Sequence, residues 1–109
     1  MDFNKYQKLA RKTAIYPNMG NNLSYPTLGL CGETGEVAEK VKKFFRDSES
    51  KMTLDLRDNL VKEMGDVLWY LSAMASELKV DFSEVAKANV EKLAKREREN
   101  KLHGSGDNR

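Results

Sequence analysis

Two short acidic segments contain the residues whose type and spacing most clearly suggest chemistry. Residues 33–37 read Glu-Thr-Gly-Glu-Val, and residues 63–67 read Glu-Met-Gly-Asp-Val. On an α-helix, residues three apart project from one face, about 60° apart around the axis and about 4.5 Å along it. Each segment therefore presents two carboxylates as a pair.

Two such pairs on helices that pack together would bring four carboxylates to one point. Anions crowded in this way repel, and some would take up protons unless a cation lies among them. Oxygen ligands select hard divalent ions, and Mg²⁺ typically keeps positions for water and for phosphate oxygens. The sequence predicts a site for Mg²⁺, with Mn²⁺ as a substitute, beside a phosphate-bearing substrate; its metal ligands would be Glu33, Glu36, Glu63 and Asp66.

Hydrophobic periodicity predicts the helices that would position these pairs. Asp2, Ser24 and Asp81 are the expected N-caps, and no strand-like alternation is present. The expected fold is all-α, a four-helix antiparallel bundle in residues 1–100 followed by a flexible tail over 101–109. The predicted helices and connections are helices at 1–15, 24–46, 54–78 and 82–99, a loop at 16–23 and a mobile connection at 47–53.

The two acidic pairs have the same position relative to the apolar stripe of their helices. Stepping 100° per residue places Glu33 at the edge of its apolar arc and Glu36 a step beyond it, and Glu63 and Asp66 have the same offset. This match predicts two packed helices with facing acidic stripes. Glycines at 32, 35 and 65 each cost roughly 1 kcal/mol in a helix relative to alanine, so close helix approach or room for a ligand is expected there.

Composition limits the classes of protein to consider. The 109 residues form one small domain, and a hydrophobic fraction of 39% predicts that burial is completed by oligomerisation. A net charge of +2 gives no nucleic-acid footprint, and the single cysteine, Cys31, excludes an internal disulfide. With no long apolar run and no signal-peptide pattern, we expect a cytoplasmic protein without membrane or nucleic-acid partners.

Several other side chains are candidates for substrate contact. Lys43 shares a side of its helix with Glu36, where it could meet phosphate oxygens or lie on the surface, and Tyr70 could stack on a base or pack in the core. Asn89, Lys92 and Arg96 lie together on one edge of the last predicted helix. A di-iron carboxylate bundle is disfavoured because it needs Glu-x-x-His pairs, and the only histidine lies in the tail.

The segments 32–37 and 62–71 resemble the MazG-like nucleotide pyrophosphohydrolases, an all-α superfamily with a Glu-x-x-Glu pair on one helix and Glu-x-x-Asp on the next. The family often has another glutamate where this chain has Gly32. The segment from Asn89 to Arg96 resembles the Asn-x-x-Lys segment of the family's last helix, which contacts substrate. The likeness covers most of residues 3–98.

The resemblance implies Mg²⁺-dependent hydrolysis of a nucleoside triphosphate to the monophosphate and pyrophosphate. It also implies a homodimer or a homotetramer (a dimer of dimers), with subunit helices completing the site. Glu33 or Glu36 would accept the proton of the attacking water, and Lys92 with Arg96 would stabilise charge on the leaving pyrophosphate. The alternatives are a non-catalytic helical module that senses a nucleotide or binds a protein, and a partner-controlled regulatory protein.

Overall fold

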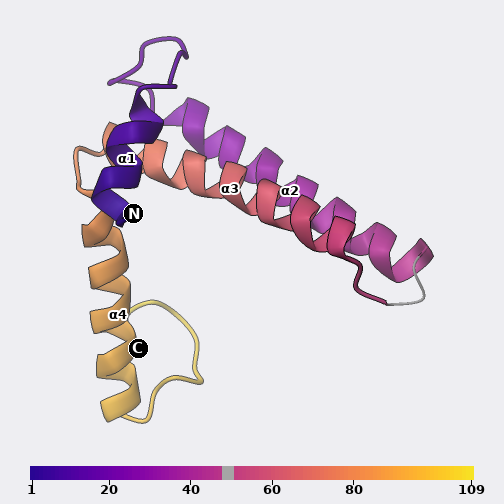
Figure 1. The fold of residues 1–109 in the computed structure, drawn as a ribbon. Helices are drawn as coiled ribbons and strands as arrows, with labels where there is room; N and C mark the ends of the chain where they lie inside the picture. The colour runs from indigo at the N-terminus through magenta and orange to yellow at the C-terminus, as the bar shows by residue number, and fades with distance from the viewer. Residues whose placement is uncertain (48–50) are drawn as a thin grey trace.

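The structure, a computed structural model, describes residues 1–47 and 51–109. Within these residues it contains four helices and no strand, which confirms the all-α fold (Figure 1). Of the predicted connection over 47–53, residues 48–50 lie outside the described part of the chain. The helices are α1 (Phe3–Arg11), α2 (Ser24–Asp47), α3 (Leu54–Glu77) and α4 (Phe82–Arg98).

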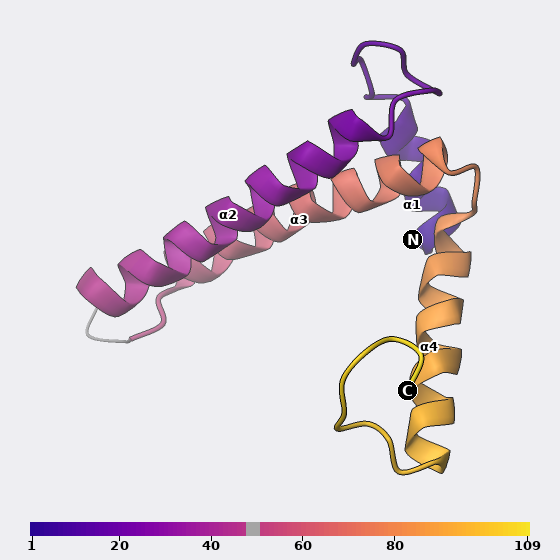
Figure 2. The ribbon, with the colours of Figure 1, turned by 180° about the vertical axis from the view of Figure 1, so that it is seen from behind.

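Helices α2 and α3 form a long antiparallel pair, and α1 packs on the C-terminal part of α3 (Figures 1 and 2). Helix α4 leaves this group in another direction and makes no contact with α2. The radius of gyration is 16.8 Å, whereas a compact domain of this length has about 13 Å. One chain therefore leaves the four-helix bundle open, and its closure by a second copy stays a prediction.

Local capping explains where two of the helices begin. The Asp2 carboxylate accepts a hydrogen bond from the backbone N–H of Lys5 at 2.8 Å, as predicted, and the Thr53 hydroxyl accepts one from Leu56 at 3.1 Å. Ser24 was the wrong cap for α2. It lies inside the helix, and the Asn22 side chain accepts the hydrogen bond from the backbone of Tyr25 instead.

The start of α4 is capped by side chains of α1. Asp81 occupies the N-cap position but makes no side-chain capping bond, so the predicted capping box is not formed. The backbone N–H of Phe82 donates to Gln7 Oε1 at 2.9 Å, and that of Ser83 donates to Asn4 Oδ1 at 3.0 Å. These bonds satisfy the first amide donors of α4 and couple its direction to α1.

A buried carboxylate organises the loop between α1 and α2. The Glu77 side chain, 1% exposed, accepts hydrogen bonds from the Tyr16 hydroxyl and from the backbone N–H groups of Gly20 (3.0 Å) and Asn22 (3.3 Å). Arg11 adds an ion pair at 3.5 Å. Burial by itself would raise the pKa of Glu77, but these donors outweigh it and lower the pKa to about 2.

The apolar side chains of the long helices remain largely unburied. The buried apolar residues in the described part of the chain are Ala10, Ala14, Tyr16, Pro26, Ala73, Ala75 and Phe82. In contrast, the large apolar residues Met64 of α3 and Val90 of α4 are 61% and 65% exposed. No described helix is both long enough and apolar enough to cross a membrane.

Candidate metal centre

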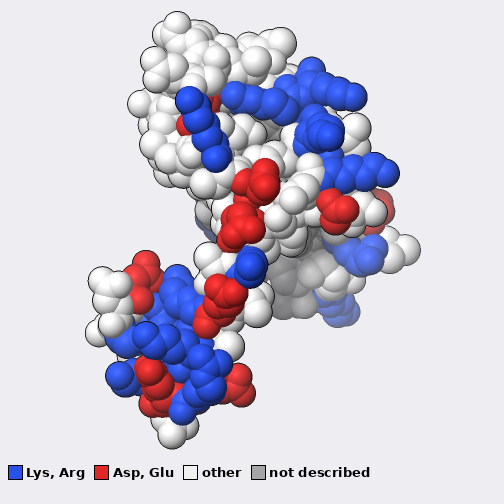
Figure 3. All heavy atoms as spheres, turned by 90° about the vertical axis from the view of Figure 1, so that its left-hand side faces the viewer, with Lys and Arg blue, Asp and Glu red and all other residues white. Residues whose placement is uncertain are grey.

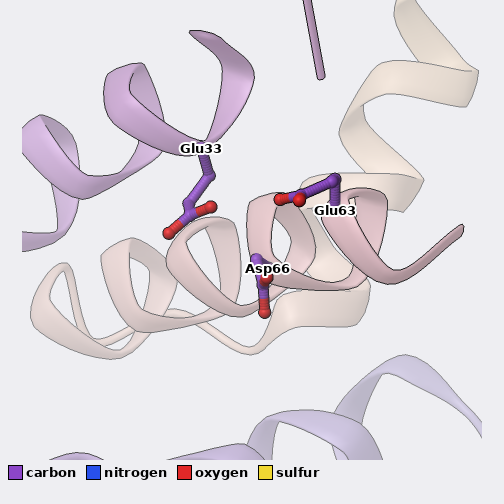
Figure 4. Close-up of side chains that lie close together, drawn as sticks. All are labelled: Glu33, Glu63 and Asp66. Carbon is purple, nitrogen blue, oxygen red and sulfur yellow. The ribbon is translucent and has the colours of Figure 1, made fainter. Parts of the chain in front are cut away.

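Three of the four predicted metal ligands lie together where α2 passes α3. Glu33 projects from α2, and Glu63 and Asp66 project from α3 (Figure 4). One carboxylate oxygen from each lies within 4.8 Å of the other two. Ligands of a single Mg²⁺ ion are about 3–4 Å apart, so modest side-chain rotation brings this group to coordination distance. The donor set and its spacing fit a hard divalent cation.

The electrostatics of the group favour a bound cation. Burial raises the pKa of Glu33, and the charges of Asp66, Glu63 and Glu36 raise it further. Three carboxylates so placed are mutually destabilising when all are ionised, and a divalent ion removes that repulsion. A divalent cation bound there would relieve the repulsion that helps to raise the pKa of Glu33.

The fourth predicted ligand, Glu36, does not belong to this close group. It is exposed on α2, one turn after Glu33, and its charge still contributes to the raised pKa of Glu33. The three-residue spacing puts Glu36 on the same side of α2 as Glu33, but Glu36 is not among the carboxylates that lie within 4.8 Å of one another. Its assignment as a metal ligand or as a proton acceptor stays a prediction.

Lys40, which the sequence places with Lys43 on the Glu36 side of its helix as a candidate for phosphate contact, also lies beside this centre. Its Nζ lies 3.3 Å from Glu63 Oε1. In the sequence, Lys40 is linked to the site only by its spacing from Glu36 on α2. The observed contact instead joins Lys40 of α2 to Glu63 of α3. The predicted phosphate contact of Lys43 stays a prediction, and here Lys43 pairs with Glu39 at 3.7 Å.

Two tyrosines lie close to the acidic group. Burial raises the pKa of Tyr70, and Tyr25, Glu33 and Asp66 raise it further; burial and then Asp66 do the same for Tyr6. The Tyr70 ring also packs against Gly29 of α2. Tyr70 therefore packs in the helix interface near the acidic group, and its contact with a base stays a prediction.

Comparison with known families agrees with this geometry. Residues 23–100, which contain the whole acidic group, match the model of the MazG nucleotide pyrophosphohydrolase domain. The chain belongs to the MazG family. It is also 47% identical over 109 residues to "Gene 37 protein" of Mycobacterium phage L5, with 95% of this chain and 96% of that protein covered. No solved structure matches the chain.

In this MazG domain, the predicted substrate contacts of α4 lie apart from the carboxylates of the same chain. Asn89, Lys92 and Arg96 are on α4, which makes no contact with α2 and runs away from the α2–α3 pair (Figures 1 and 2). Lys92 and Arg96 lie together, because both reach Asp107. Lysines and arginines gather on the part of the molecule formed by α4 and the C-terminal segment (Figure 3). A single chain thus separates the acidic half of the candidate site from its basic half.

The segment after α4 makes specific contacts that the sequence did not reveal. Residues 101–109 contain neither helix nor strand, yet the chain folds back so that Asp107 reaches α4. The Asp107 carboxylate lies 3.3 Å from Lys92 Nζ and 3.4 Å from Arg96 Nη2. Hydrogen bonding and charge from Lys92, followed by those from Arg96, lower the pKa of Asp107. The predicted flexibility of this tail stays a prediction.

Proposed function

We propose that the protein is a Mg²⁺-dependent nucleoside triphosphate pyrophosphohydrolase that releases a nucleoside monophosphate and pyrophosphate. The observation that carries the proposal is the group formed by Glu33, Glu63 and Asp66 within a MazG domain. Three carboxylates from two helices suit a hard cation, and a phosphate chain is the kind of ligand that such a cation binds.

The chain's own residues supply positioning and proton transfer. Glu33, Glu63 and Asp66 would hold the ion, which when bound would neutralise phosphate charge and help to orient a water. Glu33 and Glu36 are the candidates to accept the proton of that water. Tyr70, which lies near the charges of Glu33 and Asp66, would contact the nucleoside.

We propose that a second copy of the chain completes the site. Asn89, Lys92 and Arg96 suit an anionic leaving group, but α4 does not reach the α2 acids of its own chain. The unpartnered apolar surface of α2 and α3 supports association, because its groove of about 280 Å³ is lined by Val37, Met64, Val67 and Leu71 among others. A homodimer or a dimer of dimers would pair the acids of one copy with the cations of another.

The test is pyrophosphate release from a panel of ribo-, deoxyribo- and base-modified nucleoside triphosphates with and without Mg²⁺. We expect release from at least one of them with Mg²⁺, and loss by at least a hundredfold in Asp66→Asn and Glu63→Gln. Circular dichroism should show that these variants keep their helix content.

Asp58→Asn is the matched control, because Asp58 is exposed on the same helix and pairs only with the adjacent Arg57 among the described residues. It removes the same charge without touching the acidic group, so activity should be retained. An intact panel of triphosphates with Mg²⁺ or Mn²⁺ would refute the proposed activity. Equal loss in all three variants would show that the acidic group has no special role.

A further inference from the structure

The last nine residues form a loop that is closed on itself by one arginine. The Arg109 guanidinium donates to three backbone carbonyl oxygens, those of Lys101 (3.0 Å), Leu102 (3.0 Å) and Gly106 (2.6 Å). Its side chain also packs on Gly104, where a Cβ would lie 2.7 Å from Arg109 Cδ. These contacts close the loop. They also set the position of Asp107, which lies between Gly106 and Arg109 in the sequence.

The closed loop covers Arg96 but leaves one of its donors without a partner. Arg96 is buried, with 7% of its side chain exposed, and its Nη2 donates to the backbone carbonyl of Asp107 at 2.7 Å. Its Nε–H is buried and has no hydrogen-bond partner among the described residues. A buried donor of a charged group is costly when it is left unpaired. An anion that accepted a hydrogen bond from Arg96 Nε would remove this cost.

The side chain that neutralises this cationic pair is held loosely. The Asp107 carboxylate is 83% exposed and lies 3.3 Å from Lys92 Nζ and 3.4 Å from Arg96 Nη2, both long for charge-assisted hydrogen bonds. The loop is therefore attached through its backbone, whereas its carboxylate is exposed to solvent and readily exchanged. Phosphate offers more acceptor oxygens and more charge than one carboxylate.

We propose that the Asp107 carboxylate is an internal ligand of a phosphate-binding site formed by Lys92 and Arg96, and that an incoming phosphate displaces it. The loop over residues 101–109 is then a built-in competitor that weakens phosphate binding and keeps the cations neutralised when the site is empty. Displacement frees Lys92 Nζ and Arg96 Nη2 and lets the loop move so that Arg96 Nε gains a partner. The inference rests on the proposed role of Lys92 and Arg96 in binding substrate phosphates.

The experiment is calorimetric titration of the full chain with inorganic pyrophosphate in the absence of divalent metal. Asp107→Asn keeps the backbone bond to Arg96 and removes the competing charge. Its dissociation constant for pyrophosphate should fall about two- to fivefold, the factor that corresponds to an exposed ion pair. Lys92→Gln should weaken pyrophosphate binding in both backgrounds.

Glu97→Gln is the matched control, because it lies on α4 next to Arg96, is exposed and changes the net charge by the same amount. An equal gain in pyrophosphate affinity in Glu97→Gln would overturn the proposal, since it would show that net charge alone explains the effect. Unchanged or weaker binding in Asp107→Asn would also overturn it, as that result would make Asp107 a residue that positions the cations.

Arg109→Gln gives an independent test through the loop itself. Removing this cation should by charge alone weaken anion binding, but loosening the loop should tighten it, and we expect net tightening in the wild-type background. In the Asp107→Asn background, Arg109→Gln should produce no tightening, because the competitor is already gone. Tightening of equal size in both backgrounds would overturn the proposal.

The outcomes separate this inference from the proposed activity. Pyrophosphate tightening in Asp107→Asn without hydrolysis of any triphosphate would refute the activity and support the anion site. Hydrolysis of a triphosphate by a chain whose pyrophosphate affinity is unaffected by Asp107→Asn or Lys92→Gln would support the activity and overturn the inference.

Discussion

The phenol ring of Tyr70 on α3 lies directly against the backbone of Gly29 on α2. A Cβ at position 29 would lie 2.1 Å from Tyr70 Cε1, closer than any side chain tolerates. The two longest helices therefore pack closely at this point because Gly29 has no side chain. This contact lies on the same helix pair that holds Glu33, Glu63 and Asp66 together, so it bears on the site as well as on the fold.

Gly29→Ala should destabilise the protein by about 1–3 kcal/mol, because overpacking of the helix contact outweighs the better helix propensity of alanine. Chemical denaturation measures the change. In a Tyr70→Ala background the same substitution should cost nothing or stabilise, since the ring that it meets is gone. Equal destabilisation in both backgrounds would locate the problem elsewhere than at Tyr70.

Glu77 should make the protein sensitive to acid. Its pKa is about 2 in the folded chain, against 4.5 for the free side chain, so the folded state favours the ionised form. The corresponding stability, about 3 kcal/mol, is fully present above pH 4.5 and is lost as the pH falls towards 2. Unfolding free energies measured across this range should decrease, and they should decrease less in Glu77→Gln.

Glu77→Gln should itself lower stability at neutral pH by about 2–3 kcal/mol, because the amide cannot accept from Tyr16, Gly20, Asn22 and Arg11 as the carboxylate does. Glu97→Gln, at an exposed position of α4, is the comparison and should have little effect. A Glu77→Gln variant as stable as the wild type would contradict the role assigned to this buried carboxylate.

Glu33→Gln should stabilise the metal-free protein while removing its response to Mg²⁺. The pKa of Glu33 is raised by burial and by Asp66, Glu63 and Glu36, so its ionised form is less favourable in the folded chain than in the unfolded chain. Removing that charge should add on the order of 1 kcal/mol in EDTA. Thermal unfolding with and without Mg²⁺ measures both effects, and a metal-induced rise in Tm that survives in Glu33→Gln would exclude Glu33 as a ligand.

Met64→Lys should weaken self-association. Met64 is 61% exposed in one chain and lines the apolar groove between α2 and α3, so a charge there would be buried by a partner at considerable cost. Analytical ultracentrifugation should show an oligomer for the wild type and a shift towards monomer for the variant. Ile15→Lys, at a loop residue that is 95% exposed, should leave the oligomer intact.

The sequence by itself determined the features that depend on neighbouring residues along the chain. Apolar periodicity placed α2, α3 and α4 within one residue of their observed bounds, but it extended the first helix to residue 15 where α1 ends at Arg11. Asp2 was identified as a cap because its bond spans only three residues. The same three-residue spacing identified the pairs 33/36 and 63/66, since helical geometry alone puts both members of a pair on one side.

Only the tertiary structure decided which of these groups meet. Glu33 joins Glu63 and Asp66 whereas Glu36 stays outside, because the line of approach of α3 is set by packing such as that of Tyr70 on Gly29. Glu77 with Tyr16, Gln7 with Phe82, and Asp107 with Arg96 are contacts between residues 11 to 75 positions apart. No periodicity encodes such pairs, since they depend on the directions in which whole helices and loops pack.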